Sequence, residues 1–347
     1  MTRRHLLHAA PFLVTAAKGQ AKKPVTGQGE HTYEMEHDFL QLPEKLKFGN
    51  THGIVVDASG RIIVAHTVHK TSESPDAIAI FEPNGRFIKS WGADMRGGAH
   101  GLVIRKEGGQ EFLYICDNVK GFVRKTTLDG EVVWVLHAPV ASGLYPKASE
   151  YKPSTLAVAP NGDIFVADGY GKFYIHQYDQ NTNYIRTFGG SRDLMNRDPK
   201  IETGPGSTIW PHAVGIDIRN GAPMLMVGER GANSRVQYFT LDGRPQHVLK
   251  AGVRWPSTFD FQKGLMLMPD LKAVVTVYDQ QNKPIAVLGD GMQPDGKTYE
   301  GIRDKERDKF TPGKFIAPHA ACFEANGDIL VAEWVEIGRV TRLRKVG

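Results

Sequence analysis

The chain has 347 residues, of which 41% are hydrophobic and 23% are charged, and its formal net charge is +5. This composition is typical of a globular protein. The basic residues form no run of five or more, so nothing favours nucleic-acid binding. No segment beyond the N-terminal region is long and apolar enough to span a membrane, and no membrane partner is expected.

The N-terminal residues have the features of an export signal. Arg3 and Arg4 precede a short apolar stretch, and small residues near Ala21 suit a cleavage site. Paired arginines favour the twin-arginine export route. We therefore expect residues 1–21 to be a signal segment and the protein to be periplasmic or extracellular. The alternative is a basic tail without a targeting role. The polar residues 22–32 are expected to form a linker.

A short motif recurs six times at intervals of 45–62 residues. In each copy a Pro or a small residue is followed by His or Ser, and then by a short apolar strand. The six copies begin at Thr51, Ala99, Pro153, Pro211, Pro256 and Pro318. Self-similarity at such a period indicates repeated supersecondary units.

Each motif opens a unit with the same order of strands. A turn such as Asn161-Gly162, which is a strong hairpin signal, leads into a second apolar strand. These second strands are expected at 62–65, 112–117, 164–168, 224–229 and 329–333. Two further strands complete most units. Four short strands in each of six units predict an all-β fold, a six-bladed β-propeller over residues 33–347.

The last unit contains only about three strands, so a strand at 33–40 is expected to complete it and to join the two ends of the chain. Polar insertions at 191–210 and 290–316 are expected to form loops over one face of the ring. The two cysteines, Cys116 and Cys322, lie in strands of different blades. We expect them to be buried free thiols, without a disulfide.

The strand, Asn-Gly turn and Val166-Ala167-Asp168 pattern resembles the repeats of NHL propellers over residues 45–346. Within these propellers, the pattern of histidines is similar to that of the peptidyl-α-hydroxyglycine α-amidating lyases. This narrower resemblance rests on five positions: His100, Tyr170, His212, Arg230 and His319.

Three histidines are candidate metal ligands. The first strand of each blade lines the central channel, and His100, His212 and His319 belong to the second, fourth and sixth blades. They therefore approach the axis from directions about 120° apart, with a position left open for water or substrate, and zinc suits three imidazoles best. In the resembling lyases three such histidines hold a zinc ion. The alternative is that they are hydrogen-bonded lining of the channel.

Three other residues are candidates for contact with the substrate. His52 occupies the same motif in the first blade and is assigned to substrate binding, with a proton shuttle or simple channel lining as alternatives. The resemblance implies that Tyr170 acts on the substrate hydroxyl and that Arg230 reaches the active site. A phenol beside a metal and an arginine is expected to have a lowered pKa and to serve as a base.

The chain departs from the lyase pattern at three positions. Thr67 stands where the family has an Arg at the end of the second strand of the first blade, and His66, His69 or Lys70 are possible substitutes. Ala317 replaces a Met. Ala320 replaces an Asp that serves a structural calcium ion in the family, which removes the support for calcium here.

The resemblance implies a secreted, zinc-dependent carbon–nitrogen lyase that cleaves an α-hydroxy-amide substrate, a small molecule or a peptide, bound in the central channel of a monomer. Two alternatives remain. One is an NHL propeller that binds ligands without catalysis. The other is a lactonase-like hydrolase with calcium, which the His and Ser residues of the channel disfavour because calcium prefers oxygen ligands.

Overall fold

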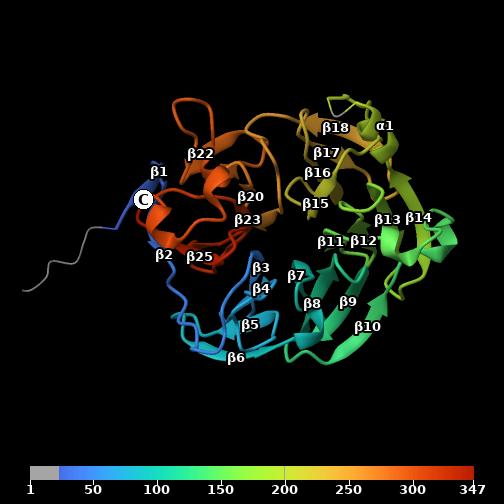
Figure 1. Ribbon diagram of the computed structural model, residues 1–347. Coiled ribbons are helices and arrows are strands. Elements are labelled where there is room, and N and C mark those ends of the chain that lie inside the picture. Colours follow the sequence, from blue (N-terminus) through green and yellow to red (C-terminus); the bar gives the residue numbers. More distant parts are fainter. Residues whose placement is uncertain (1–22, 199) are drawn as a thin grey trace, which may run out of the picture.

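In the computed structural model, which describes residues 23–198 and 200–347, six antiparallel sheets stand around a central axis (Figure 1). This confirms the six-bladed β-propeller predicted from the repeats. The predicted export signal, residues 1–21, lies outside the described residues.

The first five blades are four-stranded sheets, and each blade follows its predecessor along the chain. The first blade contains β3 (Thr51–Val56), β4 (Ile62–His66), β5 (Ile78–Phe81) and β6 (Phe87–Trp91). The second contains β7 (Ala99–Glu107), β8 (Gln110–Asp117), β9 (Phe122–Thr127) and β10 (Val132–Leu136). The third contains β11 (Thr155–Val158), β12 (Ile164–Ala167), β13 (Tyr174–Tyr178) and β14 (Tyr184–Gly189). The fourth and fifth contain β15 (Pro211–Asp217), β16 (Met224–Glu229), β17 (Arg235–Phe239) and β18 (Pro245–Leu249); and β19 (Asp260–Gln262), β20 (Leu265–Asp270), β21 (Val274–Tyr278) and β22 (Pro284–Leu288).

The sixth blade is built from both ends of the chain. Its strands are, from the axis outward, β23 (Pro318–Phe323), β24 (Ile329–Glu333), β25 (Arg339–Lys345), β2 (His31–His37) and β1 (Val25–Gln28). The strand expected at 33–40 is thus β2, and it completes the last blade by pairing with β25.

The segment expected to be a linker, residues 22–32, instead contains β1 and the start of β2. β1 pairs with β2, and it also reaches the fifth blade through a hydrogen bond from Gln28 Nε2 to the Ile285 carbonyl, at 3.0 Å. The expectation of a linker was wrong because a polar outermost strand needs no apolar pattern: Val25 is exposed, and main-chain pairing with β2 and side-chain hydrogen bonds to the fifth blade hold the strand in place.

The core consists of the interfaces between neighbouring blades. Successive residues of a strand point to opposite faces of its sheet, and both faces of the second strand are covered. In β4, Ile62 and Val64 pack toward the sixth blade, whereas Ile63 and Ala65 pack toward the second. This arrangement explains why the second strands are continuously apolar, since neither face meets water.

Helices are few and lie outside the blades. In the described part of the chain they are α1 (Arg192–Arg197) and the short 3-10 helices η1 (Ala93–Met95), η2 (Val140–Ser142), η3 (Ala148–Glu150), η4 (Tyr299–Ile302) and η5 (Arg307–Lys309). No helix among the described residues is both long and apolar enough to cross a membrane. The free cysteines Cys116 and Cys322 are both buried, as expected.

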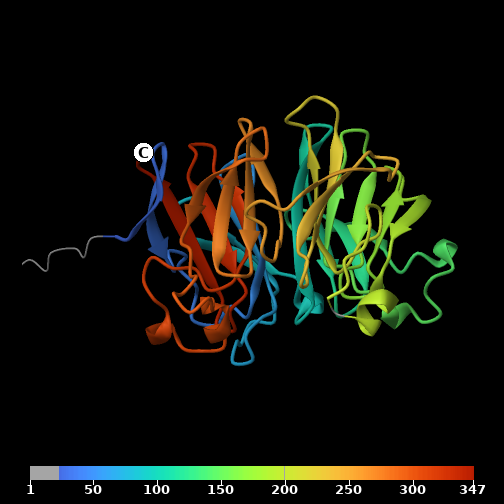
Figure 2. The ribbon, with the colours of Figure 1, turned by 90° about the horizontal axis from the view of Figure 1, so that it is seen from above.

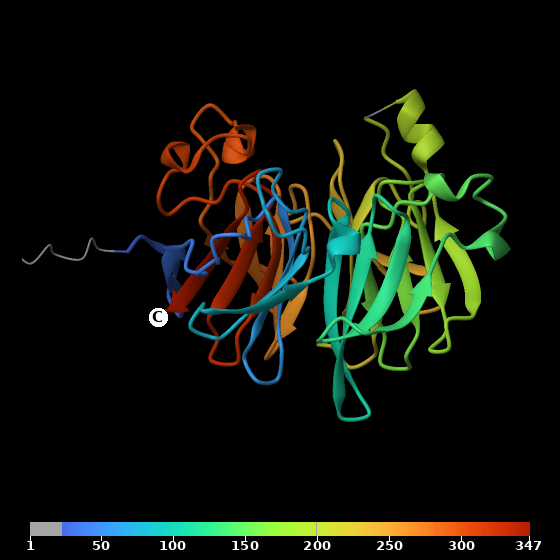
Figure 3. The ribbon, with the colours of Figure 1, turned by 60° about the horizontal axis from the view of Figure 1, so that its bottom comes forward.

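The two long insertions lie on one face of the ring. The insertion at 191–210 carries α1 and leads into β15, and the insertion at 290–316 carries η4 and η5 and leads into β23. Figures 2 and 3 show both on the same side of the blades, the yellow-green helix α1 opposite the orange helices η4 and η5. This face therefore surrounds the mouth of the channel at which the innermost strands begin.

Candidate metal centre and active site

Four histidines occupy the axis of the ring at this mouth. His52, His100, His212 and His319 are each the second residue of an innermost strand, in β3, β7, β15 and β23. In all four strands the pairing register with the second strand shifts at the histidine, as between Pro211 and Ala213. Such a bulge re-aims a side chain, and here it turns the imidazole toward the axis.

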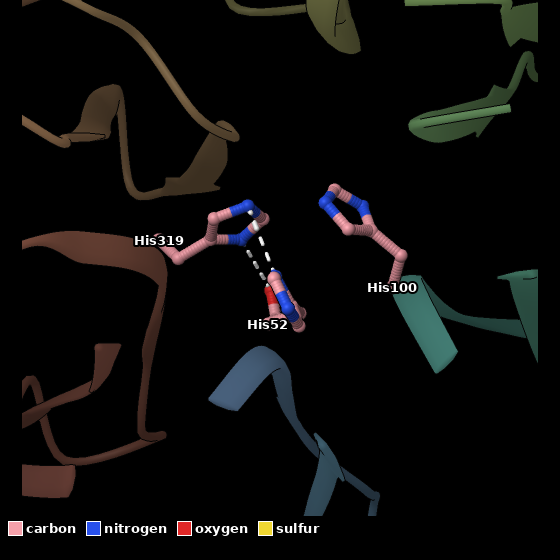
Figure 4. A group of neighbouring side chains, drawn as sticks. All are labelled: His52, His100 and His319. Atoms are coloured by element: carbon pink, nitrogen blue, oxygen red, sulfur yellow. Dashed lines mark hydrogen bonds between the residues drawn. The ribbon is translucent and has the colours of Figure 1, made fainter. Parts of the chain in front are cut away.

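The imidazoles form a compact group. The ring centroids of the predicted ligands His100, His212 and His319 lie 4.7–5.1 Å apart. The His52 ring lies 4.4 Å from that of His100 and 4.5 Å from that of His319, and these three rings face one another in Figure 4. The nitrogens of His52, His100 and His319 approach within 4.8 Å of one another. All four side chains are buried.

The main chain fixes the orientation of three of the four rings. His100 Nδ1 donates to the Ser154 carbonyl at 2.6 Å, His212 Nδ1 to the Ser257 carbonyl at 3.1 Å, and His319 Nδ1 to the His52 carbonyl at 2.7 Å. A carbonyl can only accept, so Nδ1 carries the proton and Nε2 presents a lone pair. Hydrogen bonding of this kind to the second ring nitrogen is usual for histidines that bind metals.

This pattern distinguishes His52 from the other three histidines. Ser154, Ser257 and His52 all belong to odd-numbered blades, and each supplies the carbonyl that orients a histidine of the preceding even-numbered blade. His52 therefore takes the place of the two serines. The nitrogen distances group His52 with His100 and His319. The hydrogen bonds instead favour His100, His212 and His319 as the ligand set, because in each of these three Nδ1 donates to a main-chain carbonyl.

The histidines are held in their neutral form. Burial lowers the pKa of all four imidazoles, that of His100 to about 3, and the charge of Arg230 acts in the same direction. Neutral imidazole is the form that binds a metal.

The Nε2 lone pairs of His100, His212 and His319 outnumber the protons that neighbouring groups can donate to them. The Tyr170 hydroxyl lies 2.9 Å from His212 Nε2 and 3.1 Å from His100 Nε2, and it has one proton to donate. His52 Nδ1 lies 3.3 Å from His319 Nε2 and offers at most one more, in the tautomer protonated at Nδ1. Three buried lone pairs thus share at most two protons, and an unsatisfied buried acceptor is costly. A cation bound by all three nitrogens would satisfy them, so the residues present fit a metal ion.

Tyr170 and Arg230 reach this group from equivalent positions in two blades. Just beyond the second strand, Arg230 donates its N–H to the Trp210 carbonyl and Tyr170 donates its N–H to the Lys152 carbonyl, both at 3.2 Å, and each of these carbonyls lies directly before the repeat motif of the same blade. Trp334 and Thr67 hold the equivalent positions in the sixth and first blades. Of these residues, Tyr170 contacts the histidines directly through its hydroxyl.

The Arg230 guanidinium is buried and faces inward. It donates from Nη2 to Ser257 Oγ at 2.9 Å and from Nε to the Pro256 carbonyl at 3.1 Å. Burial lowers its pKa to about 10, which leaves it charged at neutral pH. Without a metal ion, burial raises the pKa of the Tyr170 phenol and the charge of Arg230 opposes that effect, so the lowered pKa expected beside a bound metal stays a prediction.

The acidic residues that end the second strands are engaged in structure. Asp168 accepts from Lys152 N at 2.7 Å, Glu229 from Ile209 N at 2.8 Å, and Glu333 from Ile316 N at 2.7 Å. These carboxylates hold the loops that lead into the repeat motifs, so they are not available as ligands of a calcium ion in the channel.

A cavity of about 550 Å³ opens beside Tyr170. It lies between the loop that carries η3 and the insertion that carries α1, and its wall includes Tyr170, Lys152 and Arg192. Arg192 Nη1 donates to the Tyr170 carbonyl at 2.9 Å, which fixes this wall. Tyr170 thus contacts the histidine group through its hydroxyl and also contributes to the wall of this cavity.

The sequence missed two parts of the site. Ser154 and Ser257 were set aside as too short to reach a metal ion, yet their carbonyls orient two of the histidines. Their position in the repeat motif was the available signal. Arg303 was missed because it lies in an insertion that has no counterpart in the repeats, and its charge reaches His52, whose pKa it lowers.

Comparisons with known proteins give one relative along the whole length of the chain and solved structures of the same fold. No protein-family model matches the chain. Over 364 residues, covering 96% of both chains, it is 23% identical to a protein described as "Probable peptidyl-alpha-hydroxyglycine alpha-amidating lyase" from Caenorhabditis elegans. The resemblance to the amidating lyases is confirmed.

Two solved structures share the fold. A catalytically inactive virginiamycin B lyase from Staphylococcus aureus, in complex with quinupristin, aligns with a TM-score of 0.56 at 14% identity, covering 90% of this chain and all of that one. A gluconolactonase from Xanthomonas campestris aligns with a TM-score of 0.59 at 11% identity, covering 92% and 94%. At these identities the likeness to both structures is one of fold alone. The amidating-lyase resemblance thus rests on the curated relative and on the site.

Proposed function

We propose that the protein is a zinc-dependent lyase that breaks a carbon–nitrogen bond in an α-hydroxy-amide, with an α-hydroxyglycine peptide as the first substrate to test. The observation that carries this proposal is the group of neutral histidines whose lone pairs outnumber the available protons. The whole-length similarity to an amidating lyase supports the reaction class. The paired arginines Arg3 and Arg4 support export from the cytoplasm.

His100, His212 and His319 would hold the ion through Nε2. When bound, zinc acts as a Lewis acid that polarises an oxygen of the substrate. The chain contributes the orientation of the three rings, the exclusion of water by burial, and two polar groups beside the ligands.

Tyr170 and Arg230 carry the proton chemistry in this proposal. The phenolate of Tyr170 takes the proton of the substrate hydroxyl, a carbon–oxygen double bond forms, and the carbon–nitrogen bond breaks. The departing nitrogen regains a proton from Tyr170, so the products are an amide and an aldehyde, which is glyoxylate for an α-hydroxyglycine peptide. Arg230 favours the phenolate and stabilises the negative charge that develops on oxygen.

The test combines metal analysis with turnover. Protein purified without chelators or added metal should contain about one zinc per chain and should release glyoxylate from an α-hydroxyglycine peptide. Removal of the metal should abolish release, and zinc should restore it. Zinc-loaded protein that releases no glyoxylate would refute the lyase assignment, and calcium in place of zinc would favour a lactonase-like hydrolase.

A further inference from the structure

Trp334 forms a flat surface at the mouth of the channel. It follows Glu333 at the end of β24, in the position that Arg230 holds in the fourth blade, and its N–H donates to the Ala317 carbonyl at 2.8 Å. Ala317 lies two residues before His319. The indole therefore stands beside the strand that supplies one of the proposed ligands, and it is only half buried.

Arg303 lies on this indole. Its Cζ is 3.6 Å from the centroid of the Trp334 ring. Stacking of this kind holds a guanidinium by one face and leaves its N–H edge free to bind. The side chain is half buried, so it is ordered by the tryptophan and still open to a ligand.

The insertion that carries Arg303 is anchored to the fifth and sixth blades. Glu300 pairs with Lys272 of the fifth blade at 3.0 Å, and the Arg303 carbonyl accepts from Glu336 N of the sixth blade at 3.0 Å. Arg307 pairs with Asp38, which directly follows β2 of the sixth blade, at 3.0 Å. Phe310 adds an apolar contact with buried residues around Val335. The insertion is thus a fixed support for Arg303.

The charge of Arg303 is unpaired within the described residues. The neighbouring cations of the insertion have carboxylate partners: Lys305 pairs with Asp304, Arg307 with Asp38, and Lys309 with Asp308. No ion pair or side-chain hydrogen bond of Arg303 is present in the part of the chain that the structure describes. The charge of Arg303 lowers the pKa of His52, so this cation lies within electrostatic reach of the histidines.

We propose that Arg303, stacked on Trp334, binds a carboxylate of the substrate and so selects anionic over neutral substrates. The proposal deepens the lyase proposal and rests on it for the placement of the reacting end at the histidines. In the first blade, next to Trp334 around the ring, the equivalent position is Thr67, so this position supplies no cation. A guanidinium edge binds a carboxylate through two parallel hydrogen bonds, a geometry that a single ammonium cannot reproduce.

The test compares two small ligands that differ in charge. Calorimetry with zinc-loaded protein should show that glycolate binds about tenfold or more tightly than the neutral glycolamide. Arg303→Met should reduce glycolate affinity to that of glycolamide and leave glycolamide unchanged. In Trp334→Leu the preference should fall, and in Trp334→Phe it should be largely retained, because the stacking surface remains. The matched control is Lys305→Met, which removes a cation of the same insertion that already has a partner.

Turnover separates this inference from the lyase proposal. With α-hydroxyglycine peptides, Arg303→Met should raise KM about 10- to 100-fold and change kcat little, an effect absent when the substrate carboxylate is an amide. Wild-type glycolate affinity in Arg303→Met, or an equal loss in Lys305→Met, would refute the role of Arg303. Preference for glycolate without release of glyoxylate would refute the lyase proposal and leave the anion site in place.

Discussion

The Tyr170 hydroxyl has two kinds of neighbour, and each suggests a different role for it. As a hydrogen-bond donor to His100 and His212 it is part of the ligand environment, whereas beside Arg230 it is a candidate base. Tyr170→Phe should lower kcat by about 10²- to 10⁴-fold, as loss of a general base does. The zinc content should remain unchanged, because the phenol is not a ligand in this scheme. Loss of metal together with activity would show that the hydroxyl contributes to the metal site itself.

His212 and His52 provide the sharpest contrast within the histidine group. His212→Ala removes a proposed ligand and should lower zinc affinity by more than about 100-fold, beyond what loss of an orienting contact usually costs. His52→Ala keeps the carbonyl that orients His319 and should change affinity by less than about 10-fold. Competition with a chromophoric zinc chelator measures both variants. The reverse order would assign the ligand set to His52, His100 and His319 instead.

The sequence predicted the positions of the histidines better than their local geometry. The repeat motif placed His100, His212 and His319 in alternate blades, and the structure brings their rings together at the axis. The bulges that turn the rings inward and the carbonyls that orient them depend on pairing between strands, which no single motif displays. The burial that raises the pKa of Tyr170 in the absence of a metal also could not be read from the motif, because it depends on what packs over the residue.

At the scale of single elements, the second and third strands show how a blade carries buried polar groups. In β13, His176 is fully buried; its Nδ1 is 2.7 Å from Thr187 Oγ1 and its Nε2 is 2.7 Å from the Tyr145 hydroxyl, which donates to Asp168. Burial lowers the pKa of His176 to about 3. Such a network rigidifies a blade only while the imidazole stays neutral.

This network makes stability depend on pH with a definite sign. Histidine in an unfolded chain has a pKa of about 6.5. Below that pH the imidazole is protonated in the unfolded chain, whereas His176 in the folded protein stays neutral down to about pH 3. The contribution of His176 is full above pH 6.5 and is lost as the pH falls toward 3. Urea titrations between pH 7 and 4 give the unfolding free energy as a function of pH. This free energy should fall less steeply with decreasing pH in His176→Gln than in the wild type, by the slope that corresponds to uptake of about one proton on unfolding. The exposed His247→Gln is the control, and an equal change there would contradict the assignment.

Element boundaries were predictable where both faces of a strand are buried. β4, β16 and β24 lie where the apolar runs placed them, whereas β1 was taken for a linker. The difference is physical: an inner strand needs apolar residues on both faces, while an outermost strand needs only main-chain partners. The insertion around Arg303 was recognised as a loop, but its packing against the fifth and sixth blades follows from contacts that no repeat encodes.

At the scale of the whole molecule, the ring is closed by side chains from the N-terminal strand. Tyr33 and Met35 of β2 are 1% exposed and belong to the same buried cluster as Leu343 of β25. Met35→Ala should destabilise the whole protein by about 2–5 kcal/mol, since it leaves a cavity in the closing blade. Glu34→Ala, on the other face of β2, should change stability by less than about 0.5 kcal/mol. Chemical denaturation measures both, and equal effects would show that β2 does not seal the ring.

The closing blade also decides when the site comes into existence. His319 lies near the end of the chain, and its Nδ1 donates to the carbonyl of His52, which a ribosome makes 267 residues earlier. Of the described strands, β25, which pairs with β2, is the last to be synthesised. In the proposed site, a nascent chain would hold an incomplete ligand set until the sixth blade has docked against the first. Metal binding at the proposed site would therefore follow synthesis of the sixth blade, and a truncated chain that lacks this blade should not bind the metal through His319.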